Sequence, residues 1–238
     1  MFLRYAQVVF DNVVFARGFK SGWGFAAIIR GYSKTILFDT GSVGDTLLSN
    51  MLTLNVSPSE IDAVFISHTH DDHTGGLFAF LRANHRVEVF LPEDVSIGTV
   101  VAIDEAGAIP TVLGSGGEIV PGIATTGIVG KNPPEQGLVL AGDGAATLIT
   151  GCAHPGLGKL VDAAKRQFDL PVKLVIGGMH LDQSSRRKIL ALTRQLKELG
   201  VEQLAPSHCT GEASIQILSE VFDDGFIDSG LGRRIQLA

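Results

Sequence analysis

The sequence predicts a layered α/β protein, and two observations support this fold class. Of the 238 residues, 45% are hydrophobic and only 18% are charged, with 29 glycines. This composition suits sheets that are covered by helices and joined by many tight turns. In the second half of the chain, apolar strand-like segments lead into Gly- or Pro-bearing loops and then into helical patterns. A chain of this length fits one large domain or two small ones.

Short apolar runs bounded by turn residues predict the strands. In chain order these are 2–15 (one or two strands), 25–29, 35–38, 63–66, 87–91, 99–103, 110–113, 118–120, 137–141, 145–150, 172–176, 202–205 and 234–237. We expect antiparallel hairpins for the pair 25–29 and 35–38 and for the pair 137–141 and 145–150. The stretch 94–134 is rich in glycine and proline punctuation, so it predicts short strands and no helix of convincing length.

Apolar residues spaced three and four apart predict the helices. In chain order these are 44–54, 77–81, 157–168, 184–199 and 212–222. The fourth should begin at Ser184 or Ser185 and end at Gly200. Ser57 and Glu60 fit a capping box with Pro58 at the first helical position, which predicts a helical turn before the strand at 63–66.

Six residues that follow this strand carry the strongest functional signal, His68-Thr69-His70-Asp71-Asp72-His73. Alternate side chains of an extended segment point the same way, so His68 and His70 can reach one cation. Asp72 and His73 lie where the chain tightens and can face a second one. Imidazole and carboxylate ligands suit zinc, manganese or iron. The run contains no cysteine, and this absence argues against a closed structural zinc site. The alternative interpretation is an ordinary solvated surface loop. It leaves unexplained why three of the seven histidines lie within six residues.

Three later histidines share one position relative to the predicted strands. His154, His180 and His208 each follow an apolar strand, in a Gly- or Pro-bearing loop before a helix. Open α/β sheets place their ligand sites at that end of the strands. One such histidine is more often a surface or capping residue, but three of them, together with the run at 68–73, indicate one convergent site. His85 follows a helix rather than a strand, and we assign it no role.

Charge and hydropathy argue against several classes of protein. The net charge of −6 and the pI of about 5.6 argue against general nucleic-acid binding, although a metal cluster can attract phosphates locally. No apolar run approaches the roughly 20 residues that span a bilayer, and the first residues do not resemble a signal peptide. We therefore expect a cytoplasmic protein without membrane contact. The two cysteines, Cys152 and Cys209, do not indicate a disulfide framework.

The run H-x-H-x-D-H, the strand end Phe38-Asp39-Thr40-Gly41 and the strand-end histidine at 208 resemble the metallo-β-lactamase-fold superfamily. Within it, four segments look like the branch of archaeal dihydropterin (dihydropteroate-type) synthases and related metal-dependent hydrolases: 135–138, 150–156, 176–181 and 205–211. The resemblance implies one domain over residues 1–238. It would be a four-layer αββα sandwich with two mixed sheets face to face and helices outside.

The resemblance also implies a site along one edge of the sheets, with two divalent ions. Zinc is favoured, and manganese, iron or nickel are alternatives. The metal ligands would be His68, His70 and His154 for one ion and Asp72, His73 and His208 for the other. Asp39 would orient a ligand histidine from behind. Asp72 and His180 would serve in catalysis, with His180 contacting the substrate as an acid or base.

One departure from the family pattern concerns the metal bridge. Superfamily members usually carry Gly-Asp after the strand that ends near 150, and that Asp bridges the metals. Here the sequence is Gly151-Cys152, and a histidine-bearing loop expected within 121–130 contains no histidine. His154 would compensate for the missing histidine, and Cys152 would either bind metal or pack in the interior. A site with one ion and a site with two both stay open.

Three functions are open at this point. The first is a metal-dependent hydrolase that uses a metal-activated hydroxide on a small phosphorylated or ester-type substrate. The second, drawn from the branch, is a transferase that condenses a pterin diphosphate with an arylamine. The third is a metal-holding binding or sensing module without catalysis, which the missing bridging acid would fit. The expected partner is a small, anionic molecule, and the sequence does not indicate an oligomeric state.

Overall fold

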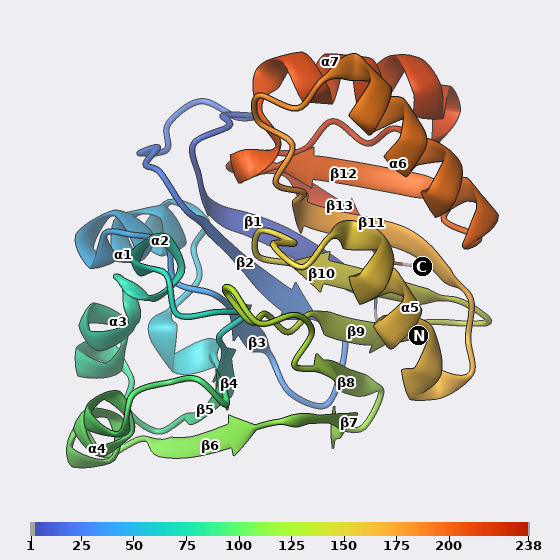
Figure 1. Ribbon diagram of the computed structural model, residues 1–238. Coiled ribbons are helices and arrows are strands. Elements are labelled where there is room, and N and C mark those ends of the chain that lie inside the picture. Colours follow the sequence, from blue (N-terminus) through green and yellow to red (C-terminus); the bar gives the residue numbers. More distant parts are fainter. Residues whose placement is uncertain (1–2, 238) are drawn as a thin grey trace. The chain divides into compact units, whose positions relative to one another are not determined.

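The computed structural model describes residues 3–237, and Figure 1 shows its helices and strands. Within that range, one sheet has seven strands and a second has six. The chain divides into two compact units, each built around one sheet. The N-terminal unit comprises residues 3–114 and 230–236, and the C-terminal unit comprises residues 115–229 and 237. The organisation as a single domain over 1–238 stays a prediction.

The N-terminal unit contains a mixed sheet with strand order β13-β1-β2-β3-β4-β5-β6. Its elements are β1 (Tyr5–Asp11), β2 (Phe25–Arg30), β3 (Ile36–Phe38), α1 (Gly44–Thr53), β4 (Ala63–Phe65), α2 (Asp71–Thr74), α3 (Leu77–Ala83), β5 (Glu88–Pro92), α4 (Ile97–Glu105), β6 (Ile109–Leu113) and β13 (Arg234–Gln236). Strands β13, β1, β2 and β3 pair antiparallel. Strands β3 to β6 pair in parallel.

Apolar helix faces build the core of this unit. Leu47 and Met51 of α1 and Phe80 of α3 are fully buried in one cluster with side chains of the sheet. The predicted capping box is present, because Glu60 accepts the backbone N–H of Ser57. That hydrogen bond, with the Arg30 guanidinium, holds the pKa of Glu60 below its usual value.

The C-terminal unit contains the second mixed sheet, with strand order β12-β11-β10-β9-β8-β7. Its elements are β7 (Ser115–Val120), β8 (Ile123–Gly127), β9 (Leu138–Ala141), β10 (Ala146–Thr150), α5 (Leu157–Phe168), β11 (Val172–Gly178), α6 (Arg186–Glu198), β12 (Gln203–Ser207) and α7 (Glu212–Phe222). Strands β10, β11 and β12 pair in parallel, and the others pair antiparallel.

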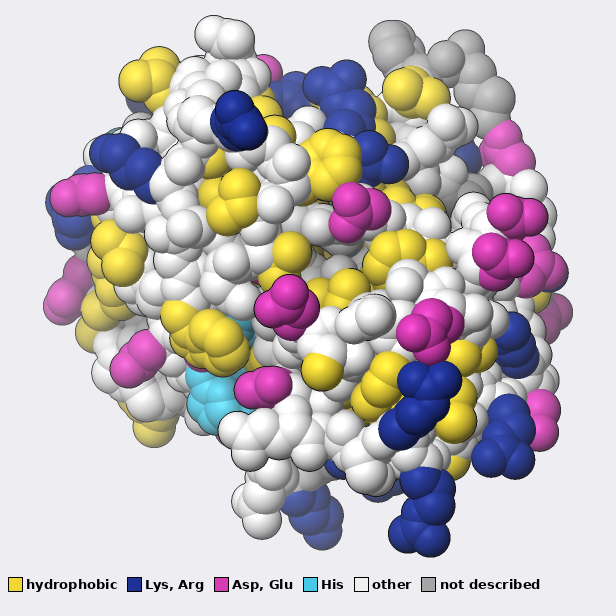
Figure 2. Space-filling model, turned by 90° about the horizontal axis from the view of Figure 1, so that it is seen from above, with side chains coloured by type: hydrophobic (Ala, Val, Ile, Leu, Met, Phe, Trp, Pro, Cys, Tyr) yellow, Lys and Arg dark blue, Asp and Glu magenta, His cyan; other side chains and the backbone are white. Residues whose placement is uncertain are grey.

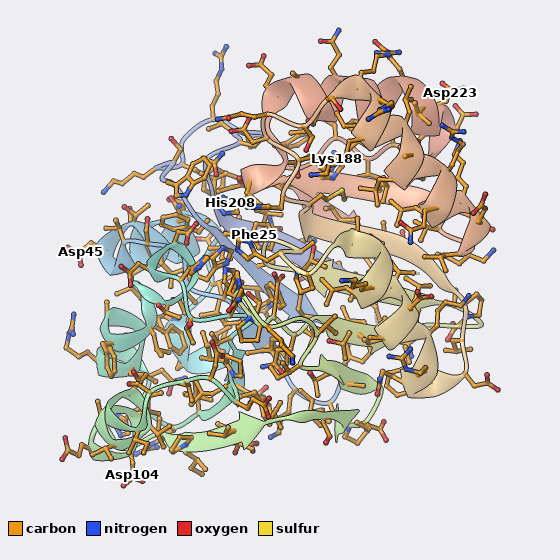
Figure 3. All side chains as sticks on the ribbon, viewed as in Figure 1. Phe25, Asp45, Asp104, Lys188, His208 and Asp223 are labelled. Atoms are coloured by element: carbon orange, nitrogen blue, oxygen red, sulfur yellow. The ribbon has the colours of Figure 1, made fainter. Side chains whose placement is uncertain are left out.

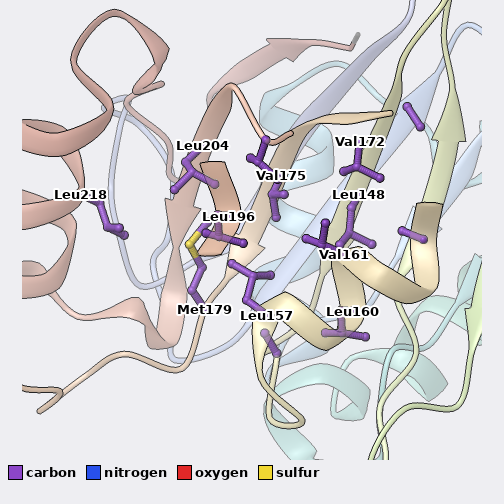
Figure 4. Packing of buried hydrophobic residues seen from close by; sticks show 14 of the residues in the cluster. Leu148, Leu157, Leu160, Val161, Val172, Val175, Met179, Leu196, Leu204 and Leu218 are labelled. Carbon is purple, nitrogen blue, oxygen red and sulfur yellow. The ribbon is translucent and has the colours of Figure 1, made fainter. Parts of the chain in front are cut away.

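The core of the C-terminal unit lies between its helices and its sheet (Figure 4). Leu160 and Val161 of α5 and Leu196 of α6 are fully buried in one cluster with Leu148 and Val175 of the strands. The amphipathic pattern of α5 explains this packing, since its buried residues recur at helical spacing while Lys159 and Arg166 lie between them. The helix spans the residues that the sequence predicts, 157–168.

Both sheets share one arrangement. An antiparallel half is joined to a parallel half, and the segments rich in histidine follow the parallel strands. Asp39 follows β3, the run at 68–73 follows β4, and His154, His180 and His208 follow β10, β11 and β12. Carboxyl ends of neighbouring parallel strands lie at one edge of a sheet. Each unit therefore gathers its candidate residues at a single sheet edge.

The prediction of an α/β protein with two mixed sheets is confirmed. The strand predicted at 99–103 is wrong, because these residues belong to α4. Ser96 caps this helix by accepting the N–H of Thr99, and Ile103 packs into the core while Ile97 stays 83% exposed. Four of the five residues at 99–103 are β-branched, a composition that favours strands, and this produced the wrong prediction. Strand β8 was not predicted.

No helix among residues 3–237 is long and apolar enough to cross a membrane.

Two leucines of α1 give a matched test of the core. Leu47 is fully buried and Leu52 is 76% exposed on the same helix. We expect Leu47→Ala to lower the free energy of unfolding by about 2–5 kcal/mol, because it leaves a cavity. Leu52→Ala should change it by about 0.5 kcal/mol or less. Urea unfolding followed by circular dichroism measures both, and similar losses in the two variants would contradict this packing.

Candidate functional site

In the N-terminal unit, the end of β3 fixes the loop that carries the histidine run. The backbone N–H and the hydroxyl of Thr40 both donate to the carbonyl of His73, at 2.8 Å each. The loop then turns at Gly75 and Gly76. A Cβ on Gly76 would lie 2.2 Å from the carbonyl oxygen of Thr40, so only glycine allows this approach. The loop is therefore held by its own unit.

Asp39 is the buried acid behind this loop. Its Oδ1 accepts the backbone N–H of Ser67, and its Oδ2 accepts the Ser67 hydroxyl, both at 2.7 Å. The same Oδ2 lies 2.7 Å from Nδ1 of His73, and both side chains are fully buried. One carboxylate thus joins the exits of β3 and β4 to the histidine at the end of the run. Asp39 contacts His73 as expected, and its role in orienting a metal ligand stays a prediction.

Hydrogen bonding assigns the ring tautomers of two histidines. A carboxylate has no hydrogen to give, so Nδ1 of His73 donates to Asp39. The hydroxyl hydrogen of Ser67 is directed to Asp39, so its oxygen accepts from Nδ1 of His68, 2.9 Å away. In the neutral rings, the lone pair then lies on Nε2 of both histidines. Metal-binding histidines are commonly oriented by such a bond from the other ring nitrogen.

The ligand atoms of the run lie in two pairs. Nε2 of His68 is 3.2 Å from Nδ1 of His70, and Nε2 of His73 is 3.7 Å from Oδ2 of Asp72. Two nitrogens about 2 Å from a tetrahedral zinc ion are roughly 3.3 Å apart. The donor set and these spacings therefore fit divalent ions of the zinc type. The prediction of two cations assigned His68 and His70 to one ion and Asp72 and His73 to the other, and these are the two pairs observed. The complete ligand sets stay a prediction.

In the C-terminal unit, close contact between β10 and β11 shapes the loops. A Cβ on Gly178 would lie 2.2 Å from the carbonyl oxygen of Gly151 and 2.8 Å from Sγ of Cys209. The hydroxyl of Thr150 donates to the carbonyl of Gly178 at 2.8 Å. The Gly-Gly pair that precedes Met179 is thus required by space, and it brings the exits of the two strands together.

Glu135 was missed as a site residue by sequence analysis. It is fully buried, and its carboxylate accepts three consecutive backbone N–H groups, those of Cys152, Ala153 and His154, at 3.0, 2.8 and 2.8 Å. Hydrogen bonds to an ionised acceptor are stronger than neutral ones. This carboxylate therefore fixes the backbone of the loop that presents Cys152 and His154. Two sequence signals were available: Glu135 is an acid shortly before an apolar strand, and it belongs to the segment 135–138 that resembles the synthase branch.

The four predicted residues of the C-terminal unit form two close pairs. The ring centroids of His154 and His180 are 4.4 Å apart. A ring nitrogen of His208 and Sγ of Cys152 lie within 4.8 Å of each other. Cys152 and His208 are buried, whereas His180 is exposed. His208, at the end of β12, is labelled in Figure 3.

Strained backbone recurs at these strand exits. Asp39, Ala153, His180 and His208 have φ values of 51°, 60°, 49° and 49°, which non-glycine residues adopt at an energetic cost. Such strain collects at functional sites, where surrounding contacts keep it in place.

One face of the molecule also shows histidine side chains at the surface, beside hydrophobic and acidic ones (Figure 2).

With this geometry established, comparison with known proteins identifies the family. A family model described as Metallo-beta-lactamase superfamily matches residues 24–208. The chain therefore belongs to the metallo-β-lactamase superfamily, as the motif at 68–73 predicted. The fold and the grouping of His, Asp and Cys side chains support the binding of a divalent metal ion.

Relatives place the chain in the predicted branch. It is similar to the 7,8-dihydropterin-6-methyl-4-(beta-D-ribofuranosyl)-aminobenzene-5'-phosphate synthase of Methanocaldococcus jannaschii, with 30% identity over 83% of this chain and 82% of the synthase. An uncharacterized protein of the same organism is 26% identical, over 96% of this chain and 98% of its own length. The branch prediction is confirmed.

A solved structure confirms the fold. The crystal structure of a metal-dependent hydrolase of the beta-lactamase superfamily matches 98% of this chain and 98% of its own, with a TM-score of 0.82 and 26% identity. The prediction of a metallo-β-lactamase-like α/β fold is therefore correct. The named relatives include a synthase and a hydrolase, so the family alone does not determine the reaction of this chain.

Glu135 provides a test of the loop. We expect Glu135→Ala to lower the free energy of unfolding by about 3 kcal/mol or more, because three backbone N–H groups lose their acceptor, two of them in buried hydrogen bonds. Glu118→Ala is the matched control, since the exposed Glu118 accepts one backbone N–H, that of Gly122, and should cost about 1 kcal/mol or less. Urea unfolding measures both. Hydrogen exchange at 152–154 should accelerate only in the first variant, and unchanged exchange there would contradict the assignment.

Proposed function

We propose that this protein is a metal-dependent hydrolase that acts on a small phosphorylated or ester-type molecule. One observation carries the proposal. In the N-terminal unit, buried Asp39 and Ser67 orient His73 and His68 so that each presents Nε2 as a metal ligand. A histidine that binds a metal commonly donates its other ring N–H to an oxygen acceptor, which fixes the tautomer, and both His68 and His73 do so here. Membership of the superfamily supports the same reading.

The proposed ligands are His68, His70 and His154 for one ion and Asp72, His73 and His208 for the other. Cys152 stands where the family usually has a bridging acid, and its position beside His208 makes it a candidate ligand. A thiolate favours zinc over the harder manganese ion. Nickel and iron are the remaining alternatives. Both ions, their identity and this ligand set are part of the proposal.

The residues divide the work of the reaction. When bound, divalent ions would supply Lewis-acid activation of water and neutralise charge on a phosphate oxygen. Asp39 and Ser67 keep two imidazoles in the tautomer that can bind, so no proton must move before metal binding. His70 is exposed and leaves its side of the run open to water and substrate. Asp72 and exposed His180 are the proposed proton-transfer groups.

A second candidate reaction is favoured by one specific observation, the 30% identity to the dihydropterin synthase over 83% of this chain. In that reaction, the amine of an arylamine ribose phosphate would form a C–N bond with the methylene carbon of a pterin diphosphate. The C–O bond to diphosphate would break, diphosphate would leave, and the amine would lose a proton. The ions would then bind the leaving diphosphate.

Removing one exposed ligand tests the metal proposal. We expect His70→Ala to lose metal and turnover together, with turnover falling roughly 100-fold or more, because an open site depends on each of its few protein ligands. His85→Ala is the control, since His85 is also exposed and lies outside the proposed site. Metal content is measured after dialysis, and turnover with nitrophenyl phosphomonoesters and phosphodiesters. Full metal and full activity in His70→Ala would remove the proposal.

Product analysis separates the two reactions. The zinc-loaded protein is incubated with dihydropterin diphosphate, with and without 4-(β-D-ribofuranosyl)aminobenzene 5'-phosphate, and the products are identified by mass spectrometry. A hydrolase should release the same cleaved fragments in both mixtures. A condensed product that forms only with the arylamine would show that the protein is a transferase and not a hydrolase. Tight metal binding with neither product, and with no cleavage of phosphoesters, lactones or thioesters, would favour a non-catalytic metal-binding module.

A further inference from the structure

The N-terminal unit contains a cavity of about 310 Å³ that the proposed metal chemistry does not use. It opens where the parallel strands β4 and β5 end, which is a common place for ligands in α/β sheets. Thr69, within the run at 68–73, and Thr74, directly after it, both line the cavity. The cavity therefore adjoins the loop that carries the proposed metal ligands, and its volume is that of a small-ligand pocket.

Most of the cavity wall is apolar. Leu77 and Leu91 are each 1% exposed and form its buried part, and Phe78 of α3 is 39% exposed at its wall. A large aromatic side chain that stays partly exposed beside buried leucines leaves a ring surface available to a ligand. Flat aromatic rings stack on such a surface. The wall therefore suits a planar ring system rather than a sugar or a free phosphate.

The polar part of the wall offers several hydrogen-bond acceptors and one carboxylate. The hydroxyl of Thr69 donates to Oδ2 of Asp94 at 3.4 Å, and that of Thr74 donates to the carbonyl of His70. The hydroxyl oxygens of Ser96 and Thr99 lie 2.8 Å apart, and this hydrogen bond uses one of their two hydroxyl hydrogens. Among the described residues that line the cavity, none is basic, and Asp94 is the acidic one. A phosphate would be repelled here, whereas a group with N–H donors would find a carboxylate.

We propose that this cavity binds the heterocyclic end of the substrate, a planar nitrogen heterocycle with adjacent N–H donors, through Asp94 and Phe78. A 2-amino-4-oxopyrimidine edge has this pattern, since its ring N–H and its amino group can donate side by side to the two carboxylate oxygens. The proposal rests on the proposed function, because it assigns the phosphate-bearing end of the same substrate to the metal ions. It names the class of substrate that hydrolysis or transfer would use.

Two pteridines that differ in one group test the cavity without any turnover. Pterin carries the 2-amino donor, and lumazine carries a 2-oxo acceptor in its place. Their binding to metal-depleted protein in the presence of a chelator is measured by fluorescence titration. We expect pterin to bind roughly tenfold more tightly or better, since a hydrogen bond to a charged group is lost with lumazine. Equal affinities, or no saturable binding of either, would overturn the proposal.

Variants identify the residues. Asp94→Asn should weaken pterin binding roughly tenfold and reduce the preference over lumazine, because an amide can donate to the 2-oxo group. Phe78→Ala should weaken both ligands, through lost stacking. Asp104→Asn is the control, because Asp104 is an exposed acid near the other end of α4 (Figure 3), outside the cavity wall. Unchanged pterin binding in Asp94→Asn would overturn the assignment.

The outcomes separate this inference from the proposed function. Selective pterin binding in a protein that shows no metal-dependent turnover would leave the cavity assignment standing and remove the proposed reaction. Metal-dependent turnover in a protein that does not distinguish pterin from lumazine would do the reverse.

Discussion

The carboxylate of Asp39 is the interaction on which the histidine run depends. It has no contact with water, and it receives hydrogen bonds from the Ser67 backbone, the Ser67 hydroxyl and His73. A buried carboxylate without such partners would be strongly unfavourable. Stability and function therefore place the same demand on this position. The folded chain needs donors around Asp39, and the donors that it uses are the groups that set the tautomers of His68 and His73.

The C-terminal unit solves the corresponding problem with Glu135. There the donors are the consecutive N–H groups of a loop rather than side chains, so the carboxylate fixes backbone where Asp39 fixes imidazole rings. In both units a buried acid lies behind residues that follow parallel strands. The strained φ values at Asp39, Ala153, His180 and His208 are compatible with this. Strong local hydrogen bonds compensate for the energetic cost of these positive-φ conformations. Without such bonds, the loops would relax to other conformations.

The sequence predicted the parts of the fold and site that depend on neighbours along the chain. His68, His70, Asp72 and His73 lie in one hexapeptide, and strand-end positions for the later histidines follow from apolar runs beside glycine. Asp39 was predicted only by family resemblance, because its partners Ser67 and His73 are 28 and 34 residues away. Glu135 lies in the segment 135–138 that resembles the branch, but it was assigned no role, because its partners lie 17 to 19 residues further along the chain. Helix α4 was missed because β-branched residues favour strands unless a cap and a core, here Ser96 and Ile103, decide otherwise.

The bonds made by Glu135 also determine how the protein should behave during metal exchange. Small zinc domains are ordered by their ion, and chelation unfolds them. Here the loop carrying Cys152 and His154 is ordered by a carboxylate of the chain itself, so its conformational entropy is already lost before any ion arrives. Removing or replacing the ion should then leave the scaffold intact. With metal bound as proposed, the protein should then exchange one ion for another in the folded state, and metal supply rather than refolding would decide which ion it carries.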